Sequence, residues 1–173
     1  MLDRVHLLAL RIFGALPRRV RRVLVRLGSP KYTVGAICIV QRRSDGAVLL
    51  VRHTYWRRWG TPGGLAKRHE RPEVAAVRET REEINLSVEL VGEPAVVVEP
   101  VPHRVDIVYL ARAVDEADLD DVRPSSPEIE RVDWFPLDAL PTLQPETVTA
   151  LQALARTGAL DLSGTDVMQR RIG

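Results

Sequence analysis

The chain has 173 residues, of which 45% are hydrophobic and 28% charged, so its length and composition indicate about one globular domain. This balance excludes a disordered chain, a collagen-like chain and a small disulfide scaffold. The single cysteine, Cys38, excludes an internal disulfide and fits a reducing compartment, so we expect a cytoplasmic protein. A net charge of +2 gives no strong electrostatic signal, and no apolar run is long enough to span a bilayer.

Residues 1–30 are expected to form a basic, amphipathic helical arm. Apolar residues recur there at helical spacing, and Pro17 is expected to divide the segment into two short helices. The arm contains one acid, Asp3, against seven arginines: Arg4, Arg11, Arg18, Arg19, Arg21, Arg22 and Arg26. Three interpretations are open: a helix packed on the domain or on a second subunit, a weak contact with an anionic membrane surface, or a signal peptide. His6 and Arg11 disfavour the signal peptide, because they interrupt its apolar region.

After the arm, residues 31–157 alternate between strand and helix signals. Strands are predicted over Thr33–Gln41 and Ala47–Thr54, and the turn residues 44–46 between them predict a hairpin. A loop rich in Trp, Arg, Gly and Pro follows over residues 55–66. A helix is predicted over Pro72–Ile84, with proline near its start.

The second half continues this alternation. Strands are predicted over 88–99, 104–114 and 131–135, with an acidic loop at 115–121. A second helix is predicted over Pro145–Arg156, and residues 158–173 are interpreted as a C-terminal tail. Mixed strands with interspersed helices predict an α+β fold or a layered α/β/α sandwich.

The predicted helix over residues 72–84 carries the residues with the clearest chemistry. Glu79, Glu82 and Glu83 stand at i, i+3 and i+4, so they share one helix face. Ala75 and Ala76 lie one turn earlier on that side, and their small size is expected to leave space for a ligand. Clustered carboxylates are hard oxygen ligands that suit Mg²⁺ or Mn²⁺. A solvated helix face of mixed charge is the competing interpretation.

The surrounding frame favours the metal site. Pro62, Gly63 and Gly64 precede the helix, Glu70 follows Gly64 after five residues, and Arg78 with Glu79 follow seven residues later. Glu82, Glu83 and Leu86 complete a pattern that resembles the signature of the Nudix hydrolases. Two positions depart from that signature: Thr80 replaces an aliphatic residue and Asn85 replaces a glycine. Asparagine tolerates the left-handed conformation of helix ends, so the second change is mild.

The resemblance implies an α/β/α sandwich with a mixed β-sheet and a Mg²⁺- or Mn²⁺-dependent enzyme. Such enzymes cleave the diphosphate bond of a nucleoside diphosphate linked to another moiety. It implies that Glu79, Glu82, Glu83 and the Gly63 carbonyl are metal ligands, and that Arg78 orients a glutamate. Gly64 and Glu70 would have structural roles, Glu70 bracing the loop or reaching a metal through water. The general base is left open between Glu79 and a later acidic segment, with Glu128, Glu130 and Asp133 as candidates.

Substrate contacts are sought beside the signature. Arginines could contact phosphates and Trp56 could stack on a base, so the candidate substrate-binding residues are Arg52, Trp56, Arg58 and Glu128. Trp59 is expected to belong to the core, and the histidines show no metal-ligand spacing. A nucleotide-type substrate is expected, with no specific nucleic acid, and a homodimer is an open alternative. A non-catalytic nucleotide sensor and an RNA-end (cap) hydrolase are the alternative functions.

Overall fold

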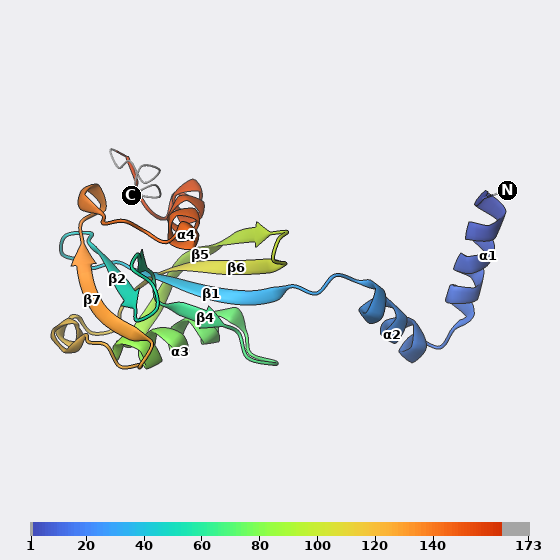
Figure 1. Ribbon diagram of the computed structural model, residues 1–173, viewed down its shortest axis with the longest axis horizontal. Coiled ribbons are helices and arrows are strands. Elements are labelled where there is room, and N and C mark those ends of the chain that lie inside the picture. Colours follow the sequence, from blue (N-terminus) through green and yellow to red (C-terminus); the bar gives the residue numbers. More distant parts are fainter. Residues whose placement is uncertain (1, 164–173) are drawn as a thin grey trace. The chain divides into compact units, whose positions relative to one another are not determined.

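A computed structural model of the chain describes residues 2–163, which separate into two compact units, the first up to Lys31 and the second from Tyr32. The first unit contains two helices, α1 (Leu2–Ala15) and α2 (Arg18–Gly28), drawn in blue in Figure 1. Pro17 lies between them, as predicted, because proline favours the first turn of a helix over its interior. None of the helices within the described residues has the length and apolar character needed to cross a membrane.

The second unit contains two sheets. The larger has the strand order β4 (Gly63–Leu65), β1 (Thr33–Val40), β6 (Arg104–Ala113), β5 (Val88–Glu99). It is a mixed sheet, because β1 runs parallel to β6 while the other pairs are antiparallel. The smaller, antiparallel sheet has the order β3 (Trp59–Gly60), β2 (Val48–His53), β7 (Ile129–Phe135). The predicted α+β class is therefore confirmed.

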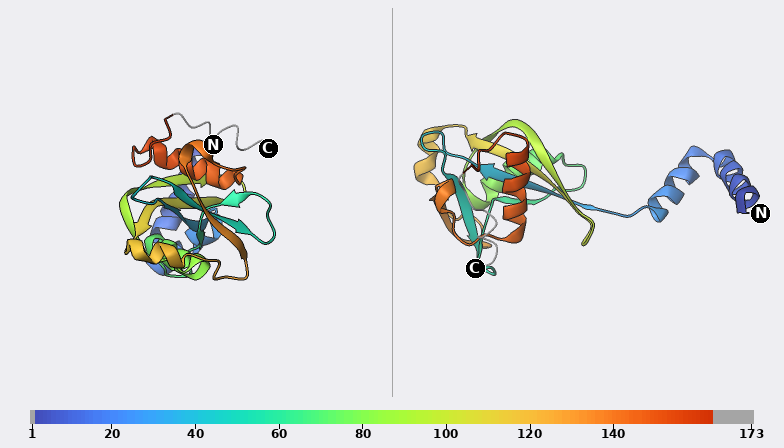
Figure 2. Two further views of the ribbon diagram at one scale, coloured as in Figure 1. Left: turned by 90° about the vertical axis from the view of Figure 1, so that its left-hand side faces the viewer. Right: turned by 90° about the horizontal axis from the view of Figure 1, so that it is seen from above.

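Helices α3 (Pro72–Ile84) and α4 (Pro145–Arg156) lie on opposite sides of the sheets (Figure 2). Alternate residues of β1 pack on the two sides of the sheet. Ile37 and Ile39 belong to the core cluster beneath α4, and Ala36 and Cys38 belong to the cluster beneath α3. Both faces of β1 are therefore buried, which explains its continuous apolar run. Two short 3₁₀ helices, Glu116–Asp121 and Leu137–Ala139, complete the described elements.

The two predicted helices, Pro72–Ile84 and Pro145–Arg156, have the same bounds in the structure. Pro72 and Pro145 each lie in the first turn, where the missing backbone N–H has no intrahelical partner to lose. Helix α3 ends at Ile84 and is capped by Asn85, whose φ of 58° is left-handed, as its place at the glycine position predicted.

The predicted hairpin between the first two strands is wrong. A turn does connect Gln41 to Val48, and the two residues form an isolated bridge, but β1 and β2 belong to different sheets. The predicted loop over residues 55–66 contains the short strands β3 and β4. The acidic loop includes the first 3₁₀ helix. In the segment interpreted as a tail, Leu160 is buried in the core beneath α4, and residues 164–173 lie outside the described residues.

Candidate active site

The double glycine of β4 lets this strand approach both β1 and α3 closely. Gly63 has a φ of 155°, and a Cβ atom there would lie 2.5 Å from the carbonyl oxygen of Ala36. A Cβ atom on Gly64 would lie 2.5 Å from Cδ of Glu79. A side chain is therefore excluded at Gly63, where the neighbour is backbone, whereas one at Gly64 would displace the Glu79 carboxylate, which rests against the backbone of β4.

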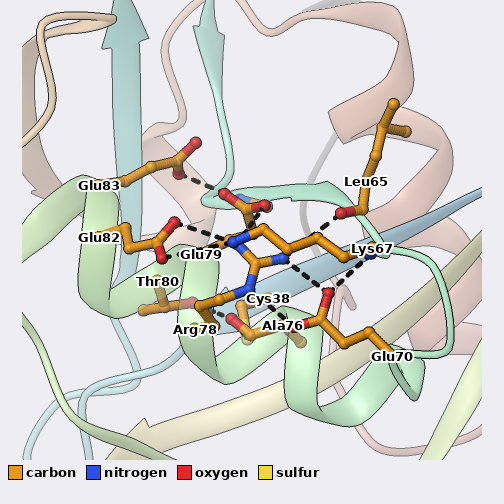
Figure 3. A network of polar contacts seen from close by, with 11 residues as sticks. Cys38, Leu65, Lys67, Glu70, Ala76, Arg78, Glu79, Thr80, Glu82 and Glu83 are labelled. Atoms are coloured by element: carbon orange, nitrogen blue, oxygen red, sulfur yellow. Dashed lines mark hydrogen bonds and ion pairs between the residues drawn. The ribbon is translucent and has the colours of Figure 1, made fainter.

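Arg78 links the acidic residues of α3 to the loop before it (Figure 3). Its Nε donates to Oε1 of Glu70 at 2.7 Å, and its Nη1 donates to Glu79 at 2.7 Å and Glu82 at 3.0 Å. Glu70 also accepts from the backbone N–H of Lys67 at 2.7 Å, which closes the loop. These charge-assisted hydrogen bonds raise the pKa of Arg78 and lower the pKa of Glu70 to about 2.

Glu83 is the buried member of the glutamate cluster, with only 7% of its surface exposed. Its Oε2 accepts a hydrogen bond from the backbone N–H of Gly63 at 3.1 Å. Its pKa is raised to about 8, chiefly by burial; the Gly63 hydrogen bond lowers the pKa, and the nearby negative charges of Glu79, Glu128 and Glu82 raise it. The structure therefore brings all three α3 glutamates close to one another and places Glu128 beside them.

The donors of this cluster suit a hard divalent cation in their chemistry, because all are carboxylate or carbonyl oxygens. In this conformation, Glu79 and Glu82 point to Arg78, and Glu83 points to Gly63 (Figure 3). Accordingly, no group of three or more His, Cys, Asp or Glu side chains within residues 2–163 is arranged to hold a metal ion. A cation bound here would compete with Arg78 for its carboxylates.

A cavity of about 270 Å³ adjoins the cluster at Gly63. Its wall includes Ile37 of β1, Tyr55 and Trp56 of the loop after β2, and Arg104 of β6. Trp56 lines the cavity and is 51% exposed, so part of its surface is accessible to a ligand. A pocket with an aromatic wall and a few polar groups beside an acidic cluster is suited to a nucleotide.

The predicted substrate-binding residues lie in different surroundings. Trp56 lines the cavity, whereas Arg52 forms an ion pair with Glu130 at 3.0 Å and lines a second hollow of about 620 Å³. Arg58 accepts a hydrogen bond at its backbone oxygen from Gln144. Glu128 lies near Tyr55 and Glu83; burial, with the negative charge of Glu128 as a smaller cause, raises the pKa of the Tyr55 hydroxyl.

The sequence did not identify several residues of the cavity wall. His53, which was assigned no role, lies there with its Nδ1 3.2 Å from Nε2 of Gln144. Arg104 is held by Asp106, which is buried, through a 2.8 Å contact. Gln144, Glu146 and Thr147 come from the start of α4. These residues come from three separate segments, around His53, Arg104 and the start of α4, so no local signal points to the site.

The alanines of α3 do not leave space for a ligand. Ala75 and Ala76 are fully buried and pack in the core cluster beneath the helix, because they face the sheet. Thr80 is also fully buried, and its hydroxyl donates to the carbonyl of Ala76 at 2.8 Å. Trp59 packs edge-on against Phe135 and against the core cluster beneath α4, consistent with its expected core position.

Comparisons with known proteins agree with this geometry. The family model of the NUDIX domain matches residues 31–156. Over 106 residues, 58% of this chain and 49% of the relative, the chain is 34% identical to a candidate 8-oxo-dGTP diphosphatase 3 of Mycobacterium tuberculosis. Over 121 residues, 69% of this chain and 46% of the relative, it is 29% identical to the NAD-capped RNA hydrolase NudC of Photorhabdus laumondii. The chain thus spans about half the length of these curated relatives.

A comparison with solved structures agrees with the match to the family model. The crystal structure of a MutT NUDIX hydrolase from Burkholderia pseudomallei superposes with a TM-score of 0.57 and 30% identity. The superposition covers 72% of this chain and 99% of that one.

Proposed function

We propose that this chain, which belongs to the NUDIX family, is a Mg²⁺- or Mn²⁺-dependent hydrolase that cleaves the diphosphate bond of a nucleotide. Its substrate would be a nucleoside diphosphate linked to another moiety. The observation that carries the proposal is the cluster of Glu79, Glu82 and Glu83 beside Gly63 and Gly64 of β4, at the edge of a cavity with an exposed tryptophan. The free, buried Cys38 supports a cytoplasmic location.

The residues that would hold the cation are Glu79, Glu82, Glu83 and the backbone carbonyl of Gly63. When bound there, a divalent cation neutralises phosphate oxygens and lowers the pKa of a water ligand. Arg78 would keep Glu79 and Glu82 on the side of the helix that faces β4, because its guanidinium contacts both. Glu70 would position Arg78 in turn.

The substrate would place its base beside Trp56 and its phosphates toward Gly63. Arg104, fixed by Asp106, supplies a positive charge at the cavity wall for a phosphate or a ribose hydroxyl. Water adds to one phosphorus, the bond from that phosphorus to the bridging oxygen breaks, and two phosphorylated products leave. The proton of the attacking water requires a carboxylate acceptor, for which Glu79 and Glu128 are the candidates that adjoin Glu83.

The decisive experiment measures product formation with Mg²⁺, with Mn²⁺ and with a chelator. The substrates are nucleoside triphosphates including 8-oxo-dGTP, ADP-ribose, dinucleoside polyphosphates, NADH and nucleotide sugars. We expect Glu82→Gln to reduce kcat by about 100-fold without unfolding the protein, because Glu82 is exposed and its role is chemical. Glu93→Gln, an exposed glutamate of β5, is the matched control and should retain full activity.

Equal activity of the two variants would refute the assignment of the glutamate cluster. Nucleotide binding without hydrolysis of any substrate, with either metal, would favour the alternative of a non-catalytic sensor. Cleavage confined to capped RNA would instead favour an RNA-end hydrolase, the activity named for the relative from Photorhabdus laumondii.

A further inference from the structure

Helix α2 separates its side chains into two faces. Val20, Val23, Leu24 and Leu27 stand at i, i+3, i+4 and i+7, so they form one continuous apolar face. The other side carries an arginine face, which consists of Arg18, Arg19, Arg21, Arg22 and Arg26. All four apolar residues are exposed, and α2 has no buried residue. The helix therefore holds an aliphatic surface that no other described residue of the arm buries.

Helix α1 extends this apolar surface. From residue 5 onward its aliphatic side chains are exposed, and the large ones are Val5, Leu7, Leu8, Leu10 and Ile12. These residues surround most of the helix, and among side chains from residue 5 onward only His6 and Arg11 are polar. A helix that is apolar nearly all round requires an apolar environment.

The arginine charges of α2 distinguish between the partner surfaces that could supply an apolar environment. A nucleic acid would neutralise the arginine face of α2 but would leave its apolar face in water. A second copy of the arm would cover the apolar faces, yet it would bring two acid-free, arginine-rich helices together with no carboxylate from α2 to pair with them. The surface of an anionic bilayer satisfies both faces at once, because its phosphates lie directly above its acyl chains.

We propose that the arm, residues 1–30, docks on the surface of a membrane rich in anionic phospholipid. Helix α2 lies in the plane of the interface, with Val20, Val23, Leu24 and Leu27 toward the acyl chains and its arginines at the phosphates. Arginine is suited to this position because its guanidinium forms paired hydrogen bonds with phosphate oxygens. The docking would hold a nucleotide-hydrolysing domain at the membrane, and it does not depend on which nucleotide that domain cleaves.

The test measures partitioning of the full chain into sedimented vesicles of phosphatidylglycerol and phosphatidylcholine in equal parts, or of phosphatidylcholine alone. We expect binding to the anionic vesicles in about 0.1 M salt, and much weaker binding in about 1 M salt, where the screening length falls from roughly 10 Å to 3 Å. Binding to the neutral vesicles is expected to be at least about tenfold weaker, since the arginine contribution is lost.

Two valines of α2 provide a matched pair of variants. Val23 is 55% exposed on the apolar face, and Val25 is 53% exposed but lies among the arginines. We expect Val23→Gln to weaken binding to anionic vesicles by about tenfold and Val25→Gln by less than about twofold. The double variant Arg19→Gln with Arg22→Gln should weaken binding by at least about tenfold, whereas Arg156→Gln, an exposed arginine of α4, should not.

Several outcomes would overturn the proposal. One is failure to bind the anionic vesicles at low salt. Another is an equal loss for Val23→Gln and Val25→Gln, which would show that the apolar face takes no part. A third is a dimer in sedimentation equilibrium that Val23→Gln dissociates while vesicle binding is unchanged, because the occupant of the apolar face would then be a second copy. Unchanged thermal melting of each variant would confirm that the domain remains folded.

Discussion

At the scale of single residues, Arg78 connects the loop to the glutamate cluster. One guanidinium contacts Glu70, Glu79 and Glu82, so its position depends on all three carboxylates. Glu70, eight residues before Arg78, lies at the end of the loop where Nε of Arg78 donates to it at 2.7 Å. A positive charge among the carboxylates also offsets part of their mutual repulsion.

The pH dependence of stability should report on the pair of Glu70 and Arg78. The pKa of Glu70 falls to about 2 in the folded chain from its ordinary value of 4.5, so the folded state favours the carboxylate. The stabilisation is therefore fully present above pH 4.5 and is lost as the pH falls through this window toward 2. We expect Glu70→Gln to lower the free energy of unfolding at neutral pH, with a difference from the unmodified chain that disappears in acid.

Urea denaturation at a series of pH values measures this difference directly. Glu93→Gln serves as the control, because it removes an exposed carboxylate of β5 that does not belong to the Arg78 network. A constant difference between Glu70→Gln and the unmodified chain across the acid range would contradict the argument, since it would indicate a loss of packing without any change in proton binding.

At the scale of elements, the end of α3 depends on one residue. Asn85 has a φ of 58°, and its backbone N–H donates to the carbonyl of Arg81 at 3.1 Å. Alanine in this left-handed conformation should reduce the free energy of unfolding by about 1 kcal/mol, because its Cβ crowds the backbone. Glycine should keep the stability within about 0.5 kcal/mol of the present chain.

Chemical denaturation of both variants tests this explanation. Since the two substitutions remove the same side-chain amide, a difference between them isolates the backbone conformation. Equal losses for Asn85→Ala and Asn85→Gly would mean that the amide side chain, and not the left-handed backbone, sets the stability of this helix end.

The elements also show which parts of the fold can be predicted from local sequence. Helices α3 and α4 could be predicted with their bounds, because each has a proline in its first turn and an apolar period within one segment. The pairing of β1 could not be predicted, since its parallel partner β6 begins at Arg104, far along the chain. The turn after β1 suggested a hairpin because local turn residues carry no information about which sheet a strand joins.

At the scale of the whole molecule, the site depends both on spacing within one helix and on contacts between segments that lie far apart in the sequence. The glutamates of α3 could be predicted from spacing because one helix turn brings them together. The cavity wall could not, because His53, Arg104 and Gln144 come from three separate segments that meet only in the folded sheets. Ala75 and Ala76 were misplaced for the same reason: without the sheet, the side of α3 that faces the core was not known.

The separation into two units predicts how removal of the arm affects the stability of the second unit. Both core clusters draw their residues from Ala36 to Leu160, and helix α2 contributes no buried residue. A chain that begins at Lys31 should therefore keep its free energy of unfolding within about 0.5 kcal/mol of the full chain. Urea denaturation monitored by tryptophan fluorescence is suited to the measurement, because Trp56, Trp59 and Trp134 all lie in the second unit.

The same pair of chains distinguishes the interpretations of the arm. A loss of more than about 2 kcal/mol on truncation would indicate that the arm packs on the domain, since that is the scale of losing several buried apolar side chains. A fall in stability that depends on protein concentration would indicate a dimer held by the arm. Equal stability, with hydrolysis unchanged and vesicle binding lost, is the result expected if the domain folds and catalyses independently while the arm determines where it does so.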